Sequence, residues 1–313
     1  MQGITDGDIA AFLDDHVNLK REAVAAYREQ VRHLRERLAG YVAEHPDFVL
    51  VKMLHFGSLA KGTAISTLRE MDVAVYLKPD GLDRSDLNSL LSTIRDLLIQ
   101  VYPQMEASQF VIDPPAVTIL YRSSGLAVDV VPVIPNGKPD DRGDLPLAYP
   151  RWIETSIPLH LEFIRKRSER HARFRELIRL TKWWRDEHEL PLQSFLIELI
   201  WAHLVDSGIL PDDLQEALLA FFSYVARTKL GERIVFGDNY RPSEVPESSD
   251  PVQAIDPVTP TNNVGAGMTS GDRVVVLGAV EAALDSVAAG SAARSKNRGV
   301  PCYQQVFGSS FNA

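Results

Sequence analysis

Three carboxylates stand where an acidic side chain is unusual. Glu70 and Asp72 open the β-rich run 70–77, and Asp129 interrupts the otherwise apolar run 126–133. Alternate residues of a strand point to one side, so Glu70 and Asp72 project together. A carboxylate in an apolar strand is costly to bury unless it is paired, hydrogen-bonded or metal-bound. If the two strands are neighbours, the three acids form one oxygen-rich cluster that suits Mg²⁺. The alternative is a solvated strand edge that carries acids and no metal.

A Gly-Ser turn precedes these acids. Gly57 and Ser58 follow the strand-like run 48–56. A glycine lets the backbone approach a ligand closely, and a serine hydroxyl with free N–H groups at a helix start binds phosphate oxygens. Two metal ions held by carboxylates clamp the attacking and leaving oxygens in phosphoryl transfer. The turn and the acids therefore predict a site for a triphosphate and metal ions.

Two kinds of element must position these residues. A heptad of Val17, Val24, Val31 and Leu38 predicts one long helix over 16–44. The first half then alternates strands with a helix, and a hairpin joins its last two strands. The second half is helical apart from a proline-rich segment over 238–272, and a connection that long is usually functional or mobile. The predicted strands are 48–56, 71–77, 117–121 and 126–134, and the later helices are 85–101, 158–188, 193–206, 211–228 and 274–289.

At this point the sequence resembles a known family. Gly57-Ser58, Gly62-Thr63, Glu70-x-Asp72 and Asp129 are similar to the motifs of DNA-polymerase-β-type nucleotidyltransferases. The nearest group contains oligoadenylate synthases, animal cyclic GMP-AMP synthase and the bacterial CD-NTases. Three further blocks resemble that group in the same order: 180–198, 256–265 and 306–308. The sequence departs from the group at Glu70, where bacterial members usually have Asp, and at Gln193 and Phe195 in the helical block.

The resemblance implies an α+β fold and an enzyme. The expected fold has two domains. Residues 1–150 would form a nucleotidyltransferase sheet core with a long N-terminal helix, and residues 151–313 would form a helical nucleotide-binding lobe with a C-terminal tail. Glu70, Asp72 and Asp129 would be catalytic and would hold two Mg²⁺ or Mn²⁺ ions. The implied reaction joins nucleoside triphosphates, ATP among them, into a cyclic di- or trinucleotide with release of pyrophosphate and without a DNA template. In anti-phage CBASS signalling an effector protein would respond to that product.

Two other functions fit the same residues. One is a nucleotidyltransferase that modifies a tRNA, an antibiotic or a protein. The other is a catalytically silent nucleotide-binding regulator. Product analysis with triphosphates alone distinguishes them from a cyclase, since the first needs an added acceptor and the second releases no pyrophosphate.

The strongest basic stretch lies in the helical half. Residues 165–185 hold nine Arg or Lys and two Glu. Arg175, Arg179 and Lys182 share one helix face, which favours Lys182 as a phosphate contact, and the resemblance supports both Lys182 and Ser194 as nucleotide-binding residues. A solvated helix face is the alternative.

Composition excludes several other classes. The 313 residues are 45% hydrophobic and 24% charged, as in ordinary globular proteins. A net charge of -9 disfavours holding duplex DNA by general electrostatics. One cysteine, Cys302, excludes an internal disulfide framework. The N-terminal residues do not resemble a secretory signal, and charged residues interrupt the most apolar windows. We therefore expect a cytoplasmic protein that does not use a membrane.

The C-terminal segment yields two expectations. Residues 287–299 are small, polar and basic, which predicts a mobile linker, and Tyr303, Val306, Phe307 and Phe311 would dock back on the body. Some bacterial CD-NTases are joined to other molecules through such a C-terminus, so operon-encoded conjugation or regulatory proteins are expected partners. The alternative is a tail that only closes the helical lobe.

Overall fold

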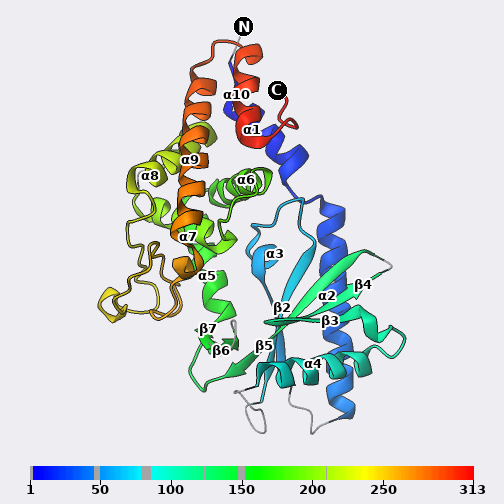
Figure 1. Cartoon of the computed structure of the whole chain (residues 1–313). Coiled ribbons are helices and arrows are strands. Elements are labelled where there is room, and N and C mark those ends of the chain that lie inside the picture. Colours follow the sequence, from blue (N-terminus) through cyan, green and yellow to red (C-terminus); the bar gives the residue numbers. More distant parts are fainter. Residues whose placement is uncertain (1–2, 46–49, 79–85, 123, 147–151, 209) are drawn as a thin grey trace. The chain divides into compact units, whose positions relative to one another are not determined.

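A computed structural model describes residues 3–45, 50–78, 86–122, 124–146, 152–208 and 210–313 (Figure 1). The contacts divide the chain into two compact units. The sheet unit comprises residues 19–62 and 67–162, and the helical unit comprises 1–18, 63–66 and 163–313. The expected boundary at 150/151 lies outside the described residues, and residues 1–18 belong to the helical unit rather than to the sheet core.

The sheet unit is built on a mixed seven-stranded sheet with the path β1-β2-β5-β4-β3. β2 and β5 are parallel, whereas β1 pairs with β2 and β4 pairs with β5 in antiparallel fashion. A short antiparallel extension, β6 and β7, continues from β5. The strands are β1 (Leu50–Phe56), β2 (Glu70–Leu77), β3 (Phe110–Asp113), β4 (Ala116–Tyr121), β5 (Leu126–Pro135), β6 (Gly143–Pro146) and β7 (Trp152–Thr155).

Two helices cover one face of this sheet. Tyr27, Val31, Leu34 and Leu38 of α2 (Arg21–Glu44) share a core with the apolar side of α4 (Leu87–Val101). The odd-numbered residues of β2 join this core, so the even-numbered ones, including Glu70 and Asp72, point to the opposite face.

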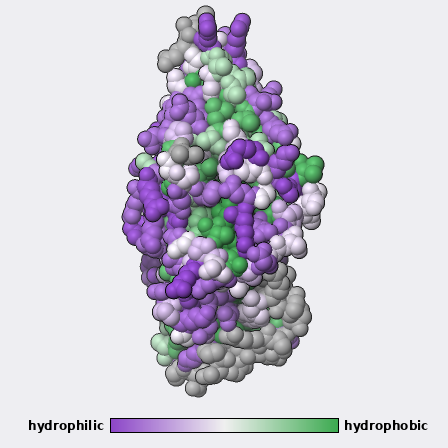
Figure 2. Space-filling model, turned by 90° about the vertical axis from the view of Figure 1, so that its left-hand side faces the viewer, coloured by the Kyte–Doolittle hydropathy of each residue, from purple (hydrophilic) through white to green (hydrophobic). Residues whose placement is uncertain are grey.

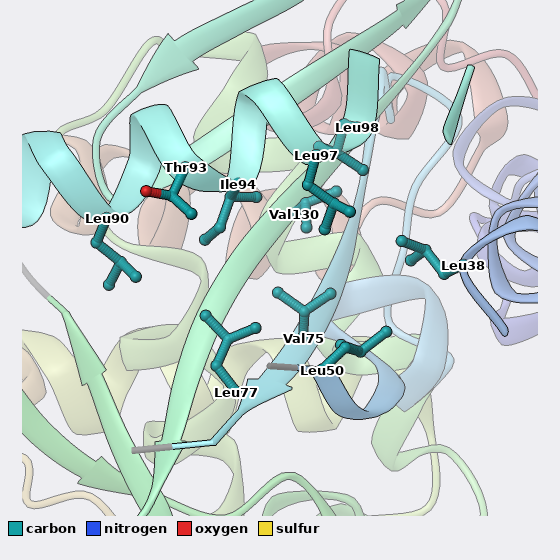
Figure 3. A pocket seen from close by; sticks show the side chains of 10 residues that line it. All are labelled: Leu38, Leu50, Val75, Leu77, Leu90, Thr93, Ile94, Leu97, Leu98 and Val130. Carbon is teal, nitrogen blue, oxygen red and sulfur yellow. The ribbon is translucent and has the colours of Figure 1, made fainter. Parts of the chain in front are cut away.

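The core under α4 leaves a cavity of about 10 Å³ (Figure 3). Leucine, isoleucine and valine side chains from α2, α4, β1, β2 and β5 point into it, as Figure 3 shows, and Thr93 is the one polar side chain labelled there. A space of this size and polarity holds at most one water molecule. The cavity is therefore a packing gap and has no room for a nucleotide.

The helical unit packs its helices around a second core. Trp184, Trp201, Phe221, Phe222 and Phe307 are almost fully buried in it. Its helices are α1 (Asp6–Phe12), the π-helix η1 (Leu13–Val17), α5 (Ile157–Arg170), which begins in the sheet unit, α6 (Phe174–Glu187), α7 (Ser194–Asp206), α8 (Leu214–Thr228), α9 (Ser270–Ala292) and α10 (Lys296–Phe307). Two 3-10 turns, η3 (Pro242–Glu244) and η4 (Val264–Gly267), interrupt the segment between α8 and α9, and a third, η2 (Ala107–Gln109), precedes β3.

α9 is the one described helix long and apolar enough to cross a membrane by length and composition. One side of it is in the core, with Val276, Val280 and Val287 buried, whereas Val274 is 71% exposed. Core helices of globular proteins pass the same test. The face of the molecule in Figure 2 is mainly hydrophilic, with hydrophobic atoms gathered in separate patches.

Two predicted helices differ from the structure. The helix predicted over 16–44 begins at Arg21, because Asn18 and Lys20 are extended and Val17 is buried in the helical unit. The helix predicted over 158–188 breaks at His171, whose ring bonds to the Pro211 carbonyl, and resumes at Phe174.

The tail prediction was half wrong. Residues 287–292 continue α9 and 296–299 begin α10, so the segment is helical rather than a mobile linker. The aromatic residues after it do dock, since Tyr303, Phe307 and Phe311 are fully buried. The tail closes the helical unit.

The proline-rich segment over 238–272 is held by buried polar bonds. The Asp256 carboxylate accepts hydrogen bonds from the Val258 N–H (2.8 Å) and the Asn262 amide (3.0 Å). The Asn263 amide donates to the Val252 carbonyl (2.9 Å), and its oxygen accepts from the Ala254 N–H (3.0 Å). These bonds replace secondary structure and fix the segment as a structural part of the helical unit.

Candidate active site

Parallel pairing of β2 with β5 brings two of the predicted acids together. Asp72 is the register partner of Asp129, and Glu70 is the partner of Ala127. Neighbouring strands lie about 4.8 Å apart, so Asp72 and Asp129 are adjacent. Glu70 lies two residues before Asp72 and projects from the same face. The register thus brings together Asp72 and Asp129, which are 57 residues apart in sequence.

Thr118 orients the third acid. It lies opposite Asp129 on β4, and its hydroxyl donates a 2.7 Å hydrogen bond to Asp129 Oδ1. The sequence analysis missed this residue. The signal was present, since Thr118 is the one hydroxyl side chain between Ala116 and Leu120 in an apolar strand.

The Gly-Ser turn lies directly against Asp72. Phe56, the last residue of β1, pairs with Asp72, and Gly57 follows with φ +70°. A Cβ atom at residue 57 would lie 1.7 Å from Asp72 Oδ2, so only glycine fits here. Gly57 opens the short helix α3 (Gly57–Lys61), in which Ser58 is half-buried. The structure therefore places Gly57 against Asp72, with Ser58 next to it in the first turn of α3.

Negative charge is concentrated at the site, and its carboxylates repel one another. Partial burial, together with the Asp129 and Asp113 carboxylates, raises the pKa of Glu70. Burial also raises the pKa of Asp129, and Asp113 adds to the effect while the Thr118 hydrogen bond opposes it. Asp113 ends β3 and was not predicted as part of the site. A cation at the acids would relieve this repulsion.

The donor set fits a hard divalent ion in kind. All the side chains concerned offer carboxylate or hydroxyl oxygens, which Mg²⁺ and Mn²⁺ prefer. Within the described ranges, no group of three or more His, Cys, Asp or Glu side chains is close enough to form a complete ligand set. Asp72 and Asp129 form the adjacent pair, and triphosphate oxygens would have to supply further ligands.

Lys182 and Ser194 lie in the helical unit and have protein partners. The Lys182 ammonium is 2% exposed and bonds to Glu198 Oε1 at 2.7 Å and to Thr63 Oγ1 at 3.0 Å. Ser194 opens α7, and its hydroxyl accepts a 3.2 Å hydrogen bond from Arg185. Their predicted contact with a nucleotide remains a prediction.

Several basic side chains of the stretch 165–185 form ion pairs with acidic residues, most of which are distant in sequence. Arg167 is buried between Asp206 (2.6 Å) and Asp238 (2.7 Å) and stacks over Phe163. Arg173 pairs with Asp6 and Glu176. Much of this charge is therefore neutralised within the unit, so the stretch is not a simple solvated face.

Comparison with known proteins assigns the chain to a family. Residues 4–166 match the model of the SMODS family, the Second Messenger Oligonucleotide or Dinucleotide Synthetase domain. The chain is 42% identical over 310 residues to a cyclic AMP-AMP-AMP synthase of Escherichia coli strain MS 115-1, covering 97% of this chain and 96% of that protein. The chain belongs to the SMODS family.

Further relatives agree with this assignment. A CBASS oligonucleotide cyclase, CdnC, of Escherichia coli strain KTE188 is 31% identical over 86% of this chain and 87% of its own length. Solved structures of the E. coli MS115-1 CdnC, one with ATP and one in complex with HORMA-deltaN, superpose with a TM-score of 0.93, 41% identity and 99% coverage of both chains.

The SMODS assignment confirms the predicted fold class and function. The protein is an enzyme, a nucleotidyltransferase that makes a cyclic oligonucleotide second messenger from nucleoside triphosphates in CBASS signalling. Enzymes of this kind generally use a divalent metal ion. Residues 57–72 and 129, which the sequence analysis singled out, lie inside the matched region.

Proposed function

We propose that this cyclase makes a cyclic trinucleotide of AMP from ATP. The observation that carries its catalytic part is the register of Asp72 with Asp129, with Gly57 packed against the Asp72 carboxylate. Two comparisons support ATP as the substrate and a ring of three nucleotides as the product. The 42% identical relative is a cyclic AMP-AMP-AMP synthase, and the CdnC structure was solved with ATP.

The residues divide the chemistry between them. Asp72 and Asp129, with Glu70 beside them, would hold two divalent ions, Mg²⁺ or Mn²⁺. Such ions would supply charge neutralisation of the triphosphate and a lowered pKa of the attacking ribose hydroxyl. Gly57 leaves room for the donor triphosphate beside Asp72, and the Ser58 hydroxyl bonds its oxygens. Thr118 keeps the Asp129 carboxylate in one orientation. Each transfer forms one phosphodiester and releases pyrophosphate.

Lys182 and Ser194 are the proposed nucleotide contacts of the helical unit. Ser194 shares its hydroxyl with Arg185, whose cationic group would be drawn toward phosphate as well. Lys182 would have to exchange Thr63 or Glu198 for a phosphate oxygen. A loss of affinity for ATP in Ser194→Ala, with turnover retained at saturation, supports the assignment of Ser194.

We further propose a regulatory protein partner and a cytoplasmic site of action. The support for a partner is the complex of the MS115-1 CdnC with a HORMA-deltaN protein. We also expect the reaction to need no DNA template. Conjugation through the C-terminal residues stays a prediction; Phe311 is buried, and Asn312 and Ala313 after it are exposed.

Pyrophosphate release from ATP alone tests this function. The purified protein is incubated with ATP and Mg²⁺ or Mn²⁺, with no acceptor, and with Asp72→Asn as the matched variant. We expect release by the wild type and a loss of at least about 100-fold in the variant, as for removal of a group that acts in the transition state. Release that requires a tRNA, antibiotic or protein acceptor, or equal release by Asp72→Asn, contradicts the proposal.

A further inference from the structure

A buried polar cluster holds the segment that links the Gly-Ser turn to the catalytic acids. Thr63, Lys182 and Glu198 are 0%, 2% and 2% exposed. The Thr63 hydroxyl donates to Glu198 Oε1 at 2.8 Å and accepts from the Lys182 ammonium at 3.0 Å. Lys182 also bonds to Glu198 Oε1 at 2.7 Å and to the Thr63 carbonyl at 3.3 Å.

These bonds satisfy the lysine completely. An ammonium group has three N–H donors, and the cluster offers three acceptor atoms. A buried ion pair is favourable only when its geometry is good and its remaining hydrogen-bonding groups are satisfied. The Thr63 hydroxyl meets that need, because it bridges the two charged side chains.

The cluster lies at a special point of the chain. The backbone leaves the sheet unit after Gly62 and returns to it at Thr67, and only residues 63–66 of this stretch belong to the helical unit. Thr63 is five residues after Ser58 and seven before Glu70. Residues 63–66 therefore connect the segment that carries the phosphate-binding turn to the strand that carries the first two acids.

The rest of the segment is held equally firmly. Ile65 is 6% exposed in the core of the helical unit and forms a bridge with Asn18. The Ser66 N–H donates to the Val17 carbonyl at 2.8 Å. Thr63, Ile65 and Ser66 are thus each held by bonds within the helical unit, and Thr63 is the one among them that contacts a buried charge pair.

We propose that Thr63, with the Lys182–Glu198 pair, is a positioning device for catalysis. It fixes the backbone between Gly57-Ser58 and Glu70-Asp72, so that the phosphate-binding turn and the metal-binding strand keep the spacing that the reaction needs. This inference rests on the proposed function. A displacement of about 1 Å at reacting groups costs about 100-fold in rate, so loosening this anchor lowers turnover more than substrate affinity.

Steady-state kinetics on hydroxyl variants of the full chain test the inference. Thr63→Val keeps the side-chain shape and removes the bridge, whereas Thr63→Ser keeps the hydroxyl. Thr93→Val is the matched control, because the Thr93 hydroxyl donates to the Ser89 carbonyl of its own helix. In Thr63→Val we expect kcat to fall at least tenfold while the KM for ATP stays within about threefold of the wild-type value. Thr63→Ser should keep a kcat near that of the wild type, and Thr93→Val should change neither constant.

A second readout keeps the test independent of overall stability. Hydrogen exchange followed by mass spectrometry should show faster exchange of residues 57–72 in Thr63→Val and unchanged exchange in α9. Wild-type kcat in Thr63→Val overturns the inference, as does a raised KM at unchanged kcat, which would show that the Thr63 hydroxyl acts on ATP binding rather than on turnover. A variant that loses protection throughout the helical unit also overturns it, because the role is then structural. If the wild type releases no pyrophosphate, the proposed function fails instead.

Discussion

Asp129 is a carboxylate in a strand whose neighbouring residues, Val128 and Val130, are fully buried. Burial and Asp113 raise its pKa, so the folded protein holds this proton more tightly than the unfolded chain does. The favourable contribution of the protonated acid is present at low pH and is lost as the pH rises through the raised folded pKa. At neutral pH without metal, the ionised acid therefore opposes folding.

The first prediction follows from that sign. Asp129→Asn should abolish pyrophosphate release and raise the melting temperature of the metal-free protein, because the neutral amide removes a charge whose burial is unfavourable. The amide oxygen can still accept the Thr118 hydrogen bond. Asp285→Asn on the exposed side of α9 serves as the control and should change neither. Scanning calorimetry in EDTA checks it, and a lowered melting temperature would contradict it.

Glu70 should tolerate shortening better than neutralisation. Glu70→Asp retracts the carboxylate by one methylene and keeps its charge, whereas Glu70→Gln keeps the length and removes the charge. We expect Glu70→Asp to keep turnover within about tenfold of wild type and Glu70→Gln to lose more than that. Initial rates of pyrophosphate release at saturating ATP measure both, and the reverse order would remove Glu70 from the metal site.

At the scale of elements, the turn between β1 and α3 sets the geometry of the acids. Gly57 and Gly125 have nearly the same backbone, with φ +70° and φ +69°. A Cβ at Gly57 would collide with the Asp72 carboxylate, whereas a Cβ at Gly125, in the turn between β4 and β5, meets nothing within 4 Å. The two glycines form a matched pair that separates backbone strain from the collision.

We expect both alanine variants to lose about 1–2 kcal/mol of stability through the positive φ. Gly57→Ala should in addition lose at least about 100-fold in turnover, because the displaced Asp72 no longer lies beside Asp129. Gly125→Ala should keep near wild-type turnover. Chemical denaturation and pyrophosphate release measure the two effects. Equal turnover in both variants would show that the contact with Asp72 has no catalytic weight.

Elements with a clear local period were predictable from sequence. The short apolar runs became β2, β4 and β5, because strands buried in a sheet are rich in apolar residues, and the heptad became most of α2, because it records burial on one side of a helix. The four-residue strands β3, β6 and β7 were missed, because segments that short carry too few residues to form a pattern. The break before Arg21 was missed as well, since Val17 continues the heptad although it is buried in the other unit.

At the scale of the whole molecule, the site was more predictable than its surroundings. Glu70, Asp72 and Asp129 stood out because acids are rare in buried strands, and the structure places Asp72 and Asp129 in register. The partners of the basic residues could not be read locally. Arg167 pairs with Asp238, 71 residues away, and Lys182 with Glu198 on the next helix. A count of charges along the sequence predicts that such residues are exposed. In the folded protein they are buried, because each pairs with an acid that is distant in sequence.

The mass of the nucleotide product tests the central claim most directly. The wild type is incubated with ATP and Mg²⁺, the reaction is treated with phosphatase, and the resistant product is identified by mass spectrometry, with Asp72→Asn in parallel. The account predicts a phosphatase-resistant cyclic trinucleotide of AMP in the wild type and none in the variant. A linear product whose terminal phosphates are removed, or the same cyclic product from Asp72→Asn, would contradict it.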